Sequence, residues 1–164
     1  MQGELLLTDA QPSTWTPSAP PSLTDCDTVA LDVETTGLRW WDGDRPIGIG
    51  ITWSETHTQY LSWGHHGGGN LDEQVIKRWA QRELRGKHVV NLNTRFDLHM
   101  LHAWGIDLEA QGCTVEDVAH SAALLDDHRQ RFSLDALAQD YLGREKTGKD
   151  LDAVSYTHLT LPTN

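Results

Sequence analysis

The sequence predicts an α/β domain built around a mixed sheet. Three short segments rich in β-forming residues follow one another between residues 28 and 63, which is typical of an antiparallel meander. After residue 70 the apolar positions change to helical spacing, and helices then alternate with short strands. A chain of 164 residues with 38% hydrophobic positions is large enough to form one such core.

The meander is expected from three short apolar runs that turn-forming residues separate. The first is Thr28-Val-Ala-Leu-Asp-Val33, and a turn-rich segment from Gly37 to Pro46 follows it. The other two runs are Gly48-Ile-Gly-Ile-Thr-Trp53 and Gln59-Tyr-Leu-Ser-Trp63. Because the connections are short, consecutive strands are expected to pair with each other.

The second half is expected to alternate helices with strands. The predicted helices cover residues 71–84, 96–104, 114–125 and 133–142, and the predicted strands cover residues 88–92 and 113–115. Thr114 and Ser133 are candidate N-caps, since their hydroxyls can accept from the first free amides of a helix. Gly105 and Gly143 follow apolar stripes and mark helix ends.

Both ends of the chain are expected to lie outside the domain. Residues 1–27 contain four prolines among Ser and Thr, which predicts a flexible leader. Residues 154–164 contain no formally charged residue and resemble translated sequencing-adapter read-through. We therefore interpret residues 28–153 as a C-terminally truncated domain with an artefactual tail, and a genuine tail is the alternative.

Composition restricts the classes of partner. The chain has 13 Lys and Arg against 24 Asp and Glu, a net charge of −11, which argues against a protein held on nucleic acid by charge alone. No run approaches the roughly 18–20 apolar residues of a membrane span, and the N-terminus lacks a secretory signal. With only Cys26 and Cys113, the chain is expected to be a cytoplasmic protein without a membrane partner.

Two carboxylates end the first predicted strand. Asp32 and Glu34 are two residues apart, so they project from the same face of that strand. Such a like-charged pair is tolerated where a cation lies between the two groups or where one of them is protonated. Hard divalent cations prefer oxygen ligands, which this pair supplies. The alternative is two ordinary surface acids.

A third acid opens the helix that follows the strand at residues 88–92. Asp97 lies beside Phe96 and on the side of the apolar stripe, so we expect it near the buried face. In the first helical turn, the amide dipoles of the helix stabilise its charge. Simple helix capping is the alternative, but capping does not explain Asn93 and Phe96 together with Asp97.

These motifs resemble a known family. Asp32-Val-Glu-Thr-Thr-Gly-Leu38 and Asn93-Thr-Arg-Phe-Asp97 resemble the first two motifs of the DEDD 3′–5′ exonucleases, closest to the proofreading domain of family A (polymerase I-like) DNA polymerases. Residues 100–108 and 133–142 extend the likeness. The resemblance implies a ribonuclease H-like fold with a mixed five-stranded sheet. It also implies a single-stranded or frayed DNA 3′ end as substrate and a C-terminal polymerase domain as a candidate partner.

The resemblance further implies a site with two Mg²⁺ or Mn²⁺ ions that clamp the scissile phosphate. In that site Asp32 would bridge both ions, Glu34 would bind the ion that activates water, and Asp97 would support the second ion. The implied substrate-binding residues are Thr35, Leu38, Asn93 and Phe96. Leu38 matches a position where an apolar side chain packs against the terminal base.

The sequence departs from the family at the third motif, Tyr-x-x-x-Asp or His-x-x-x-x-Asp. The one pair with a matching spacing, His102 and Asp107, falls at the end of the helix that carries Asp97, so we interpret it as a decoy. We therefore expect the chain to be weakly active or inactive. The alternatives are a ribonuclease D-like or Werner-type exonuclease acting on RNA or DNA, and a degenerate nucleic-acid-binding module. A haloacid dehalogenase-type phosphatase is disfavoured, because Glu34 stands where that class needs Asp.

One aromatic segment fits two interpretations. Arg39-Trp40-Trp41 follows the first motif directly, and its indoles are able to stack on single-stranded bases. Equally, the two tryptophans are able to pack beneath their own loop. The sequence leaves both open.

Overall fold

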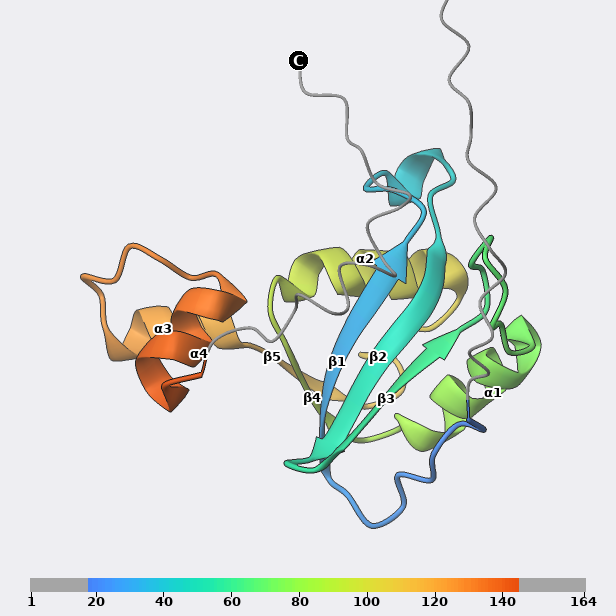
Figure 1. Cartoon of the computed structure of the whole chain (residues 1–164), viewed down its shortest axis with the longest axis horizontal. Helices are drawn as coiled ribbons and strands as arrows, with labels where there is room; N and C mark the ends of the chain where they lie inside the picture. Colours follow the sequence, from blue (N-terminus) through green and yellow to red (C-terminus); the bar gives the residue numbers. More distant parts are fainter. Residues whose placement is uncertain (1–17, 145–164) are drawn as a thin grey trace, which may run out of the picture. The chain divides into compact units, whose positions relative to one another are not determined.

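The computed structural model describes residues 18–144, and in that range five strands form one mixed sheet in the order β3-β2-β1-β4-β5 (Figure 1). The antiparallel pairs are β1–β2 and β2–β3, and the parallel pairs are β1–β4 and β4–β5. The expected meander and mixed five-stranded sheet are confirmed. The strands are β1 (Thr28–Thr35), β2 (Pro46–Ser54), β3 (His57–Ser62), β4 (His88–Asn91) and β5 (Thr114–Asp117).

Four α-helices and one short 3-10 helix lie within the described range: η1 (Trp40–Asp42), α1 (Glu73–Glu83), α2 (Thr94–Trp104), α3 (Val118–Leu125) and α4 (Leu134–Leu142). Ser133 caps α4 by accepting from the amide of Ala136, as its sequence position predicts. The strand predicted at residues 113–115 is found, one residue later, as β5, but the helix predicted from residue 114 begins only at Val118. Thr114 is not a cap but the first residue of β5, because residues 114–117 pair with β4.

The chain divides into two compact units after residue 118. The first holds the sheet, η1, α1 and α2. In the second, Arg129 forms a 3.0 Å ion pair with Asp140 and lies over the ring of Tyr141. Across residues 18–144, every helix is too short or too polar to cross a bilayer.

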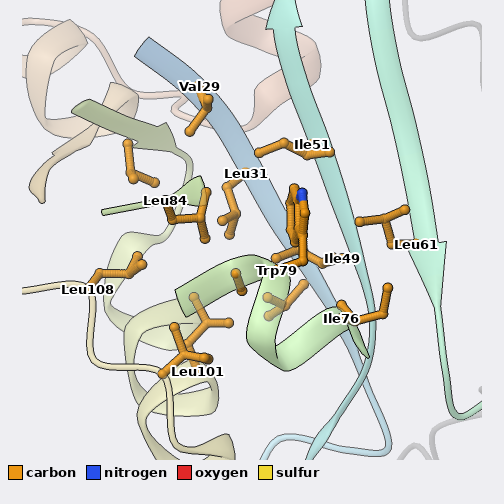
Figure 2. Close-up of a cluster of buried hydrophobic side chains, with 14 of the residues drawn as sticks. Val29, Leu31, Ile49, Ile51, Leu61, Ile76, Trp79, Leu84, Leu101 and Leu108 are labelled. Carbon is orange, nitrogen blue, oxygen red and sulfur yellow. The ribbon is translucent and has the colours of Figure 1, made fainter. Parts of the chain in front are cut away.

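The core of the first unit lies on one face of the sheet. Along β1, buried and exposed residues alternate, and Leu31 and Val33 point to the buried face. Figure 2 shows Ile76 and Trp79 of α1 beside side chains of the sheet. Asp32 and Glu34 therefore project from the opposite face of β1, away from this core.

The segment before β1 differs from the flexible leader that its composition predicts. Within residues 18–27, Leu23 is buried and its amide donates to Glu83 Oε2 at 2.8 Å. The indole of Trp79 donates to the carbonyl of Pro21 at 2.6 Å. These bonds attach the segment to α1. Residues 1–17 and 145–164, the predicted adapter-like tail among them, lie outside the described residues.

Candidate active site

The two acids of β1 lie beside two glycines of the neighbouring strand β2. Asp32 pairs with Gly50 and Glu34 with Gly48 across the antiparallel ladder, and Gly50 in turn pairs with Tyr60. Directly paired residues share a face, so two side-chain-free positions lie next to the carboxylates. A Cβ at Gly48 would overlap the phenol oxygen of Tyr60. The Tyr60 ring therefore leans across these glycines toward the position opposite Glu34.

Tyr60 is held by a histidine from the loop after β3. Its hydroxyl forms a hydrogen bond with Nε2 of His65, and the backbone of His65 is fixed by two bonds to the Asn70 amide, at 2.9 and 2.7 Å. Burial, and then the charges of Glu34 and Asp32, raise the pKa of Tyr60 above its ordinary value. The phenol therefore stays protonated at neutral pH, next to the two carboxylates. Sequence reasoning missed Tyr60, because strand periodicity alone does not reveal cross-strand neighbours.

Asp97 is the buried member of the acid group. Its side chain is 3% exposed, it accepts from Asn91 Nδ2 at 2.6 Å, and it also accepts from the backbone of Val33. Burial, and then the negative charge of Asp32, raise the pKa of Asp97 to about 7. Val33 stands between Asp32 and Glu34 in the chain. The bond to its backbone thus places Asp97 beside the strand that carries the other two acids.

The first turn of α2 is held from a neighbouring strand. Asn93 has a left-handed conformation, with φ 63°, and its side chain makes no capping bond. Instead, the amide of Thr94 donates to Asp117 Oδ2 at 3.0 Å, and the Thr94 hydroxyl donates to Asn91 Oδ1. Asn91 and Asp117 pair with each other at the carboxyl ends of parallel strands β4 and β5. The side-chain amide that donates to Asp97 is therefore that of Asn91.

Asn91, Thr94 and Asp117 were not identified from the sequence. The signal that would have found them is a pair of polar residues at the carboxyl ends of two adjacent parallel strands, where α/β proteins place their ligand sites. Using this signal would have required extending the strand predicted at residues 113–115 as far as Asp117. Asp117 also adds negative charge near Asp97 and contributes to its raised pKa.

The remaining predicted residues lie around η1 and the start of α2. Thr35 donates its hydroxyl to the carbonyl of Gly37 at 2.7 Å, and Leu38 is 60% exposed. Phe96 packs partly into the core, with its ring 6.5 Å from that of Trp40. Asn93 is exposed.

The predicted decoy, His102 and Asp107, lies at the other end of α2. Its two side chains approach only to 4.0 Å, and both are largely exposed. This end of the helix carries its C-terminal stop at Gly105, whereas Asp97 lies in the first turn. The pair is therefore separate from the candidate site.

The acids fit hard divalent cations by chemistry. Asp32 and Glu34 supply carboxylate oxygens, and Asp97 is a carboxyl whose ionised form is disfavoured by burial and by the charge of Asp32, so a cation between these acids would relieve the repulsion. Among residues 18–144, no three or more His, Cys, Asp or Glu side chains are already grouped to hold a metal ion. The donor set is thus suitable in kind, without a preassembled cage.

A family model described as 3′–5′ exonuclease, of the DNA polymerase A type, matches residues 18–157. The DNA polymerase DpoZ of Salmonella phage PMBT28 is 33% identical over 127 residues, which is 77% of this chain and 19% of the phage protein. The chain therefore spans about a fifth of the length of that relative.

Solved structures share the fold. Brucella melitensis NrnC with bound Mg²⁺ superposes with a TM-score of 0.58 at 20% identity, covering 88% of this chain and 65% of that one. Pol1 from M. smegmatis, in complex with DNA primer-template and dNTP, gives 0.54 at 21% identity, covering 74% and 20%. The expected ribonuclease H-like fold is confirmed. By its family match and its phage relative, the chain belongs to the 3′–5′ exonuclease family of the DNA polymerase A type.

Proposed function

We propose that this domain hydrolyses nucleotides from the 3′ end of DNA with the help of two Mg²⁺ or Mn²⁺ ions. The observation that carries the proposal is the position of Asp97: from the start of α2 it accepts from the backbone of Val33, the residue between Asp32 and Glu34, and burial, followed by the charge of Asp32, raises its pKa to about 7. Two motifs 65 residues apart thus supply acids to one place. Carboxylates gathered in this way are suited to cations rather than to a packed core.

The acids and the residues around them have different tasks in this proposal. Asp32, Glu34 and Asp97 hold the ions, which supply Lewis acidity and an activated water when bound. Asn91 and the backbone of Val33 fix the orientation of Asp97 by hydrogen bonding. The phenol of Tyr60 stays neutral beside Glu34, so it adds no charge that competes with a cation.

The proposed substrate is a single-stranded or frayed DNA 3′ end. Leu38 is exposed directly after the strand that carries Asp32 and Glu34, where an apolar side chain can pack against the terminal base. Thr35, Asn93 and Phe96 complete the proposed substrate contacts. The phage relative is a DNA polymerase, which supports DNA as the substrate. The match covers only 19% of that protein, which supports a polymerase domain as partner.

Trimming of a 5′-labelled single strand by residues 1–164 tests the proposal. With Mn²⁺ we expect slow shortening from the 3′ end, because the 164 residues contain no Tyr-x-x-x-Asp motif. Asp32→Ala should abolish the shortening, and EDTA should abolish it as well. Asp107→Asn is the matched control, since it removes one exposed carboxylate at the far end of α2 and should change nothing.

Three outcomes would contradict the proposal. Trimming that survives Asp32→Ala or EDTA would show that the acids do not hold a catalytic ion. Strong preference for an RNA strand of the same sequence would favour the ribonuclease D-like alternative. Metal-independent binding without trimming, unchanged by Asp32→Ala and Asp97→Ala, would favour a degenerate binding module.

A further inference from the structure

The large indole side chain of Trp41 is exposed to solvent beside the candidate site. Its side chain is 67% exposed, and Leu38, three residues before it, is 60% exposed. Both residues follow β1 directly and so lie beyond the end of the strand that carries the acids. Exposing an indole forfeits the free energy that its burial would provide, so the fold alone does not account for Trp41.

The neighbouring tryptophan explains how Trp41 is held. Trp40 stacks on His99 of α2, with ring centroids 4.4 Å apart and planes 6° from parallel, and it meets Phe96 edge to face. Phe96 and His99 flank Asp97 in the sequence of α2. The ring of Trp41 stands at 90° to that of Trp40, with centroids 4.5 Å apart. Trp40 is therefore the packed member of the pair, and the ring of Trp41 remains exposed to solvent.

Hydrogen bonds and an ion pair within the loop that carries Trp41 hold this loop in place. Asp44 Oδ2 accepts from the amide of Arg39 at 2.8 Å, and its carboxylate fills the space that a Cβ at Gly37 would need. Arg39 also forms a 3.0 Å ion pair with Asp42. An aromatic surface on such a braced loop loses little conformational entropy when a ligand binds.

We propose that Trp41 is a stacking platform for an unpaired nucleobase of the strand whose 3′ end occupies the acid site. The inference rests on the proposed function for its ligand. Every base has a π-face, so stacking accepts any sequence, as removal of nucleotides one after another requires. A chain with a net charge of −11 gains little from general phosphate attraction, so stacking is a suitable source of its affinity for single strands.

Binding of dye-labelled single-stranded DNA to residues 1–164 tests the platform, with Ca²⁺ in place of Mg²⁺ to suppress hydrolysis. Trp41→Ala should weaken binding by about 5- to 150-fold, which is the range that base–aromatic stacking covers. Trp41→Phe should retain most of the affinity, because it keeps a ring. Trp53→Phe is the control: this tryptophan packs partly against the core, and β2 places it at the opposite end of the sheet from Trp41.

An abasic nucleotide locates the contact. Placed at successive positions from the 3′ end, it should weaken binding of the unaltered chain at one position and have no effect there in Trp41→Ala. Equal binding by Trp41→Ala and the unaltered chain, together with a 3′-specific abasic penalty in both, would overturn the platform and leave the proposed function standing. An abasic penalty that is the same near the 5′ end as near the 3′ end would instead count against the proposed function.

Discussion

The two longest helices of residues 18–144 begin in different ways. α1 is capped locally, because Asp72 Oδ1 accepts from the amide of Val75 at 2.9 Å. α2 begins after a left-handed Asn93 that provides no side-chain cap, and Asp117, 23 residues beyond Thr94, accepts from its first amide. α1, which carries none of the three acids, is thus capped by a residue of its own segment. The helix that carries Asp97 is tied to β4 and β5, which fixes its first turn relative to the sheet.

This difference has an electrostatic consequence. The start of α2 collects both Asp97 and Asp117, and the charge of Asp117 contributes to the raised pKa of Asp97. The start of α1 carries only exposed acids, which solvent screens. Stability alone favours the arrangement at α1, whereas the arrangement at α2 is suited to holding a cation.

Asp97→Asn should have the largest effect. Trimming should fall by about 10³-fold or more, since a metal ligand contributes several kcal/mol to transition-state stabilisation. The variant also tests the raised pKa. Because burial and Asp32 raise it from 3.8 to about 7, the protonated carboxyl contributes stability that is complete below pH about 4 and is lost as the pH rises to about 7.

The measurement is urea unfolding across that range without divalent cations. Relative to Asp97→Asn, the free energy of unfolding of the unaltered chain should decrease between pH about 4 and about 7 and be level above it. The exposed control Asp107→Asn should show no such difference. A difference between the chain and Asp97→Asn that does not change with pH would contradict the assignment of the raised pKa.

Asn91→Ala should have the next largest effect. It removes the donor to the buried carboxyl of Asp97 and the acceptor of the Thr94 hydroxyl. Unfolding should become easier by about 1–3 kcal/mol, and Mn²⁺ affinity should fall by about 10- to 100-fold. Titration calorimetry with Mn²⁺ measures the second effect, and unchanged affinity would show that Asn91 does not orient a ligand.

Two substitutions of Asp117 distinguish its capping of α2 from its negative charge. Asp117→Ala should lower the free energy of unfolding by about 0.5–2 kcal/mol, because the amide of Thr94 loses its acceptor. Asp117→Asn keeps an acceptor oxygen and removes the charge, so it should retain most of that stability. In both variants the pKa of Asp97 should decrease, which NMR titration of the carboxyl detects. Equal destabilisation by the two variants would mean that the charge, not the cap, matters.

Asp72→Ala should have the smallest effect on function. Loss of the local cap of α1 should cost about 1 kcal/mol of stability in thermal or urea unfolding. Mn²⁺ affinity and trimming should stay as they are. A loss of Mn²⁺ affinity comparable to that of Asn91→Ala would remove the distinction between the two helix starts.

Short-range patterns were sufficient for much of the fold. Alternation along β1 predicted that Asp32 and Glu34 share a face opposite Leu31, and the structure agrees. The glycine stop at Gly105 and the cap at Ser133 were also predictable, because each depends on residues within about four positions. The assignment of Asp97 to the buried side followed from helical spacing in the same way.

The tertiary structure alone decided which distant groups meet. The strand predicted at residues 113–115 extends to Asp117 because β4 is there to pair with it, and this pairing brings Asp117 to Thr94. The packing of Leu23 on α1 and of Tyr60 over Gly48 likewise joins separate segments. Periodicity and caps reflect contacts within a turn or a strand. Contacts between residues far apart in the sequence form only when the whole chain folds around its core.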